Sequence, residues 1–252
     1  MGGLARRATL IQDTRDQTDV PVLVVDAGNT LMGKSLSLAS EGRVLVDAMN
    51  LMGYDALGIG VGELIQGPEI LEARAQEASF PLVSANLVDA ATGEPLFEPW
   101  VLIERKGTRF GVLGLSNPGA LLGIESLWPG AEILPAQQAL TRYLDEVRSQ
   151  SDVVVVLSLL GLDSDQVLAQ NVAGIDVIVG GNERYLLTEA SSVNNTTIVQ
   201  VGYDGEWLGQ LDLTPADQGF AGVYTVLYMR PEVADDADMR ALVTRYYEEY
   251  LP

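Results

Sequence analysis

The sequence predicts an α/β layered fold. The chain of 252 residues is 47% hydrophobic, which is enough to bury a substantial core. Its first third alternates short apolar runs with loops and with segments of helical spacing, and its last part turns to strand-like runs separated by turn residues. No repeat, low-complexity tract or linker interrupts these patterns, so one domain over residues 1–252 is the simplest account.

The first third contains three short apolar segments that predict buried strands, and two helices lie between them. A proline followed by an acid suits the start of the second helix. The strands are expected at Val22–Asp26, Ala56–Ile59 and Pro81–Ser84, and the helices at Glu41–Met52 and Pro68–Ser79.

The rest of the chain predicts a hairpin, two buried strands around a short helix, and a strand-rich end closed by a helix. The hairpin is Trp100–Arg105 with Arg109–Leu115, followed by a helix at Gln137–Gln150. The buried strands are Val153–Leu157 and Val177–Val179, and the short helix lies near Asp165–Asn171. The last strands are Thr197–Val201, Trp207–Leu213 and Val223–Met229, before the helix at Asp235–Tyr250.

Composition excludes several classes of function. The net charge is −20, and Lys34 and Lys106 are the only lysines, so the surface repels phosphate backbones and argues against nucleic-acid binding. Apolar runs such as Val153–Leu160 are too short to span a membrane. The start of this sequence shows no signal peptide. The chain has neither cysteine nor histidine, which removes thiolate and imidazole chemistry.

Six short strings occur in order along the chain: Gly2–Arg7, Asp26–Asn29, Met52–Ala56, Ser84–Leu87, Leu157–Gly161 and Gly180–Gly181. Together they resemble the N-terminal domain of the 5′-nucleotidase family, which belongs to the calcineurin-like metallophosphoesterases. The similarity runs to about Leu213, and the helix at 235–250 resembles the interdomain helix of that family. The resemblance implies a four-layer α-β-β-α sandwich with the active site on loops at the strand ends.

The resemblance also implies two-metal hydrolysis, which needs carboxylate and imidazole ligands. The family supplies them in the motifs D-x-H, D-A-G-D, G-N-H-E, Ser-His and G-G-H-x-H. The first motif would lie upstream of Gly2, and the other four read D-A-G-N, G-V-G-E, Ser-Leu and G-G-N-E-R. The ligand positions that align therefore hold residues that lack the expected donor: Asn29, Val61, Gly62, Leu159, Asn182 and Arg184. This pattern predicts that no metal or other cofactor is bound.

Asp26 and Glu63 are the surviving acids of these motifs. They either bind one weak cation or accept hydrogen bonds from loop amides, and the second interpretation is favoured because hard cations need several oxygens. Arg184 either pairs with Glu63 or Asp26 in the vacated metal region or is an exposed loop residue.

Three asparagines could contact a small anion or polar ligand at the same place: Asn29, Asn86 and Asn182. Turn chemistry is the favoured alternative, because asparagine tolerates left-handed backbone.

The strand at Val22–Asp26 is expected to have a free edge, because the segment carrying D-x-H would form its neighbour in the resembling fold. Three interpretations are open: the sequence is trimmed from a longer one, the sheet is rearranged, or a partner donates a strand. The first two are favoured because strand donation is the rarer mode. The chain ends at Pro252, just after the helix that would lead into the family's separate substrate domain.

These features predict a non-catalytic binding or structural subunit of a larger assembly, with a protein partner. The alternatives are a metal-independent or single-metal phosphoester hydrolase that uses Asp26, Glu63 or a tyrosine, and a sensor of small ligands. The resemblance alone favours a periplasmic or extracellular location.

Overall fold

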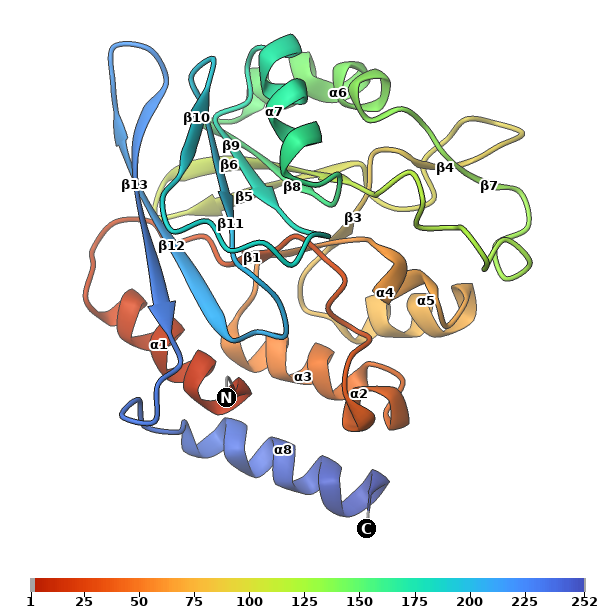
Figure 1. The fold of residues 1–252 in the computed structure, drawn as a ribbon, viewed down its shortest axis with the longest axis vertical. Helices are drawn as coiled ribbons and strands as arrows, with labels where there is room; N and C mark the ends of the chain where they lie inside the picture. The colour runs from red at the N-terminus through yellow and green to blue at the C-terminus, as the bar shows by residue number, and fades with distance from the viewer. Residues whose placement is uncertain (1–2, 252) are drawn as a thin grey trace.

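The computed structural model describes residues 3–251, so Met1, Gly2 and Pro252 lie outside the described part. Two β-sheets pack face to face, and helices cover the outer face of each (Figure 1). The predicted four-layer α-β-β-α sandwich is therefore confirmed. Among the described residues, no helix combines the length and apolar character needed to cross a membrane.

The first layer consists of helices on the outer face of the smaller sheet. They are α1 (Leu4–Asp16), α2 (Ser35–Ala39), α3 (Arg43–Met52), α4 (Val61–Leu64), α5 (Pro68–Glu77) and α8 (Ala237–Tyr250). Met49, Leu57 and Leu71 belong to the buried cluster that joins these helices to the sheet, and each is at most 1% exposed. The carboxylate of Asp236 accepts a hydrogen bond from Met239 N at 2.8 Å and so caps α8.

The smaller sheet is parallel, in the order β1 (Val25–Asp26), β2 (Ala56–Gly58) and β3 (Leu82–Val83). All three strands are shorter than the predicted apolar runs, but each lies within the predicted range. In the described part of the chain, β1 has β2 as its only strand neighbour, which agrees with the free edge expected there.

The larger sheet has the order β10-β11-β9-β8-β6-β5, with parallel pairing from β11 to β6 and an antiparallel strand at each end. Its strands are β5 (Trp100–Arg105), β6 (Thr108–Leu115), β8 (Val153–Ser158), β9 (Val177–Gly180), β10 (Ser191–Val193) and β11 (Thr196–Gln200). Two ribbons flank it: β4 (Leu87–Asp89) with β7 (Ala131–Ile133), and β12 (Trp207–Pro215) with β13 (Phe220–Tyr228).

The fourth layer is formed by α6 (Ala136–Gln150) and α7 (Leu162–Asn171), which lie together on the outer face of the larger sheet (Figure 1). Every residue of β8 is buried, as its unbroken apolar run predicts for a strand covered on both faces. Ala56 and Val83 of the smaller sheet share a buried cluster with Val112 and Val155 of the larger one. That cluster forms the interface between the two middle layers.

The layers bring several loops together at one end of the molecule. The loops that follow β1, β2, β8 and β9 each leave the carboxyl end of a parallel strand. In open α/β sheets this is the end where functional groups collect. The predicted site residues lie on these loops, at the end of β1 or in the first turn of α4, except Asn86, which follows β3.

Candidate functional site

The side chain of Leu159 fills the point where four loops meet. Leu159 follows β8 and is completely buried. A Cβ added at Gly28 or Gly60 would lie 2.9 or 2.5 Å from Leu159 Cδ1, and one added at Gly181 would lie 2.8 Å from Leu159 Cδ2. The two methyl groups therefore pack directly against glycine backbone in the loops after β1, β2 and β9.

Asn29 ties the first two of these loops together. Its Oδ1 accepts a hydrogen bond from Gly62 N at 3.0 Å, and its backbone is left-handed with φ of 60°. A Cβ at Gly62 would lie 2.9 Å from Asn29 Cα, so the backbones approach as closely as glycine permits. Val61, which stands with Gly62 in place of the Asn-His pair of the G-N-H-E motif, begins α4 and is 38% exposed.

Both carboxylate oxygens of Glu63 accept hydrogen bonds from backbone N–H groups. Its Oε1 accepts from Thr30 N at 2.7 Å and Leu31 N at 3.0 Å, and its Oε2 accepts from Asn29 N and Gly60 N, both at 2.8 Å. The residue is 3% exposed. Burial raises the pKa of Glu63, while the four backbone N–H donors oppose that rise. The favoured interpretation, an acid that holds loop amides, agrees with this geometry.

Asp26 is likewise used within its own loop. Its Oδ1 accepts from Gly28 N at 3.0 Å and from Thr30 Oγ1 at 2.8 Å, which fixes the turn after β1.

Of the two alternatives for Arg184, the structure agrees with the exposed loop residue, and the pairing with Glu63 or Asp26 is wrong. Arg184 is exposed, and its guanidinium lies over the ring of Tyr203, 4.9 Å from the ring centroid. The loop after β9 directs Arg184 towards Tyr203, and the four backbone N–H groups already occupy Glu63. Asn182 is exposed on this loop with φ of 73°, which agrees with the turn chemistry expected of it.

Arg7 provides the cation beside Asp26 that was expected of Arg184. Its side chain hydrogen-bonds Tyr54 and interacts electrostatically with Asp26, and burial raises the pKa of Tyr54. A Cβ at Gly205 would lie 1.6 Å from Arg7 Nη2, so the guanidinium lies directly against that turn. Arg7 was not among the predicted site residues, and because the helix α1 that carries it was not predicted either, no signal in the sequence indicated its position.

Asn86 is a structural residue and has no group free for a ligand. Its Nδ2 donates to Ser116 O at 2.9 Å and Leu134 O at 3.2 Å, and its Oδ1 accepts from Ser116 N at 2.7 Å. Ser84 Oγ also donates to Oδ1, at 3.3 Å. The side chain is completely buried, which corrects the expectation of a ligand contact at this position.

Known proteins resemble this chain along its whole length. A probable 5′-nucleotidase from Treponema pallidum is 34% identical over 196 residues, which cover 76% of this chain and 32% of that protein. The sulfate thiohydrolase SoxB of Thermus thermophilus superposes with a TM-score of 0.92 at 26% identity, over 99% of this chain and 47% of SoxB. A 5′-nucleotidase precursor from Thermus thermophilus superposes with a TM-score of 0.87 at 26% identity, over 98% and 53%.

The chain belongs to the 5′-nucleotidase family. It spans 32% to 53% of the length of the relatives above. No family model matches the sequence. The similarity to the 5′-nucleotidases confirms, at the level of the family, the resemblance that the sequence motifs indicate.

The residues present do not fit the pair of metal ions that this family implies. Leu159 puts methyl groups at the junction of the loops, and Asn29 and Glu63 spend their oxygens on backbone N–H donors. Among residues 3–251, no group of three or more acidic, histidine or cysteine side chains could hold a metal ion. Val61 presents only a hydrocarbon side chain. No step through a metal can be derived from this arrangement.

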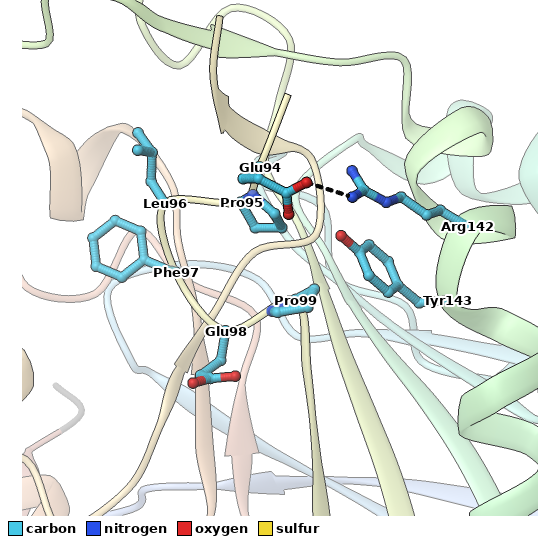
Figure 2. Close-up of a pocket in the computed structure, with 8 residues that line it drawn as sticks. All are labelled: Glu94, Pro95, Leu96, Phe97, Glu98, Pro99, Arg142 and Tyr143. Carbon is cyan, nitrogen blue, oxygen red and sulfur yellow. Dashed lines mark hydrogen bonds and ion pairs between the residues drawn. The ribbon is translucent and has the colours of Figure 1, made fainter. Parts of the chain in front are cut away.

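Two open hollows lie elsewhere on the described surface, and none of the predicted site residues lines either one. The first has a volume of about 480 Å³ and lies between segment 94–99 and α6, where Glu94 pairs with Arg142 beside Tyr143 (Figure 2). The second has a volume of about 660 Å³ and lies between α3 and α8. Arg142 donates to Gly93 O and Glu94 Oε1, so its guanidinium group is already paired with residues of the first hollow.

Proposed function

We propose that this chain is a catalytically inactive member of the 5′-nucleotidase family that acts as a binding or structural subunit. The observation that carries the proposal is the burial of Leu159 against Gly28, Gly60 and Gly181. A leucine cannot donate an electron pair to a cation, and its methyl groups occupy space that coordination would require. The scaffold is retained while the junction of its loops is apolar.

The same proposal is supported because several of the expected metal-ligand positions are altered together. Losing one group that orients a metal ligand costs about 10–100-fold in metal affinity or activity. Here the bridging carboxylate is replaced by Asn29, and the imidazoles expected in the resembling motifs are replaced throughout. These losses remove negative charge and donor atoms together, so no partial site is left to build on.

The hydrolase alternative would need an acid or base free to move a proton. Glu63 accepts four backbone hydrogen bonds, and Asp26 accepts two bonds within its own turn. Asp165, whose pKa burial raises to about 7, is completely enclosed. Glu63 and Asp165 therefore present no oxygen to a substrate, and Asp26 uses Oδ1 within its own turn and lies beside the cation of Arg7, which favours the non-catalytic proposal.

A protein partner is part of the proposal, and the free edge of β1 is where a donated strand would fit. Val24 N donates to Asp55 Oδ2 at 2.6 Å, and Val24 O accepts from Asp55 N at 2.7 Å. Peptide groups alternate in direction along a strand, so those of Leu23 and Val25 point away from β2. A partner strand would pair with them by main-chain hydrogen bonds.

A phosphatase screen tests the inactive assignment. Purified protein would be assayed with nucleoside monophosphates and p-nitrophenyl phosphate in Mg²⁺, Mn²⁺ or Zn²⁺, beside the Thermus thermophilus 5′-nucleotidase as the active reference. We expect no turnover above a protein-free blank. Metal-dependent turnover that Asp26→Ala abolishes would overturn the proposal, because it would show that the chain itself, and no contaminant, carries the activity.

A further inference from the structure

Two buried oxygens beside Gly180 lack a hydrogen-bond donor. Asp165 lies in the first two turns of α7 and Gln200 ends β11, and they are 0% and 1% exposed. Among the described residues, neither Asp165 Oδ2 nor Gln200 Oε1 has a partner. A Cβ at Gly180 would lie 2.9 Å from the first oxygen and 3.0 Å from the second, so both border the same backbone position. Unpaired buried acceptors are costly, and this pair calls for an explanation.

The amide of Gln200 cannot solve the problem by turning over. Its Nε2 donates to Glu183 O at 3.1 Å and to Tyr185 O at 3.0 Å. Reversing the amide would place its oxygen against these two carbonyl oxygens and lose both bonds. Gln200 Oε1 is therefore fixed as an acceptor on the side of Gly180.

A proton on Asp165 Oδ2 would supply the missing hydrogen-bond donor. Asp165 Oδ1 already accepts the hydroxyl of Ser158, which leaves Oδ2 as the oxygen that can carry a proton. We propose that Asp165 is a neutral acid whose Oδ2–H is donated to Gln200 Oε1, forming a proton-dependent latch between α7 and the loop 183–187. One proton then satisfies both unpaired oxygens at once.

The charges around Asp165 favour the protonated form. Burial raises the pKa of Asp165 to about 7. The hydrogen bond from the hydroxyl of Ser158 lowers this pKa, and the negative charge of Glu183 raises it. Glu183 lies on the loop after β9 and accepts from Leu162 N at 3.0 Å. From β13, Tyr224 donates its hydroxyl to Gln200 O at 3.2 Å, and burial raises the pKa of Tyr224 to about 12, so it stays protonated.

The remaining charged groups nearby do not neutralise this carboxyl group. Arg184, on the same loop as Glu183, has its guanidinium over Tyr203. Asp163, on α7 itself, is exposed and negative. The contacts from β8 and β9 come from Ser158 and Gly180, which do not titrate near neutral pH.

The sign of the pH dependence follows from the two states of the chain. An unfolded aspartate has a pKa of about 3.9. The folded acid binds its proton more tightly, so the latch contributes its full stability below about pH 3.9, and that contribution is lost as pH rises through about 7. Above that pH, a carboxylate faces Gln200 Oε1 and repels it, and the hydrogen bonds from Gln200 Nε2 to Glu183 O and Tyr185 O weaken. The loop bearing Asn182 and Arg184 then loosens.

A carboxyl titration on the intact protein tests the proposal directly. The ¹³C chemical shift of the Asp165 carboxyl would be followed by NMR from about pH 4 to pH 9, with the Asp165→Asn spectrum used to assign it. We expect a midpoint near 7. A midpoint at 5 or below would overturn the proposal, since Asp165 would then be charged whenever the protein works near neutrality.

Urea unfolding at about pH 5 and pH 8 provides the second readout, with Asp163→Asn as the matched control. The amide of Asp165→Asn can accept from Ser158 and donate to Gln200 at every pH. We expect the midpoint of this variant to fall less between the two pH values than that of the wild type. Asp163→Asn, which removes an exposed charge from the same helix, keeps the wild-type fall. Equal falls in the two variants would refute the latch, and the titration decides the case where Asp165→Asn does not fold.

Discussion

Leu159 changes the chemistry of the loop junction more than any other single residue. It is completely buried, and its methyl groups pack closely against the backbone of three glycine-bearing loops. A methyl group there excludes water and offers no lone pair. One side chain therefore accounts both for the tight packing of the loops and for the loss of a place for a cation.

Truncating this side chain should be costly. Leu159→Ala removes buried methyl groups from a junction whose glycine backbones cannot collapse inward, so we expect a loss of about 3 kcal/mol in the free energy of unfolding. Urea denaturation measures it. Leu122→Ala, at a leucine that is 76% exposed, is the control and should change the free energy by less than about 0.5 kcal/mol. Similar small losses in both variants would contradict the packing described for Leu159.

Glu63 gives a second prediction at the scale of one residue. Glu63→Gln would turn an NH₂ group towards two of the four backbone N–H donors, so we expect a loss of about 2 kcal/mol in unfolding free energy. Glu69→Gln tests the same chemical change at an exposed carboxylate in the first turn of α5. A variant at position 63 as stable as the one at position 69 would show that the loop amides do not depend on this acid.

At the scale of elements, apolar patterning predicts the buried strands and the amphipathic helices well. The hairpin of β5 and β6 and the helix α6 agree with prediction to within one residue at each end. The helix α1 was not predicted, because its apolar positions are sparse and only Ile11 is buried in it. The helices α2 and α4 were not predicted either, because they are five and four residues long and too short for a repeating helical pattern.

The site could be predicted only in part, for a reason that also lies in the elements. Motif order predicted which residues lie on which loops, and the surviving acids hold backbone amides as favoured. The partners of Arg184 and Arg7 depend on how the loop after β9 and the helix α1 pack, and no spacing rule contains that information. The same holds for Asn86, whose partners lie 30 and 48 positions further along the chain.

The free edge of β1 yields a prediction about this strand. The amide of Val24 donates to Asp55, whereas those of Leu23 and Val25 point away from β2. We expect the Leu23 and Val25 amides to exchange with deuterium faster than the Val24 amide, by NMR on the isolated protein. Slow exchange at all three amides would show that the edge is already covered and would leave no room for a donated strand.

At the scale of the whole molecule, the dominant feature is a net charge of −20. Charge of one sign destabilises the compact state by self-repulsion, and salt screens that repulsion. We therefore expect the free energy of unfolding in urea, an uncharged denaturant, to rise as NaCl increases from about 0.02 to 0.5 M. A fall over this range would mean that ion pairs such as Arg43–Glu77 and Arg109–Asp152 outweigh the repulsion.

The central claim is that this member of the 5′-nucleotidase family keeps the fold but cannot hold its metal ions. Metal stoichiometry tests it most directly: the protein is equilibrated with Mn²⁺ or Zn²⁺, dialysed, and analysed by inductively coupled plasma mass spectrometry. We predict well under 0.1 equivalents of either metal per chain. Two equivalents that survive dialysis would contradict the account.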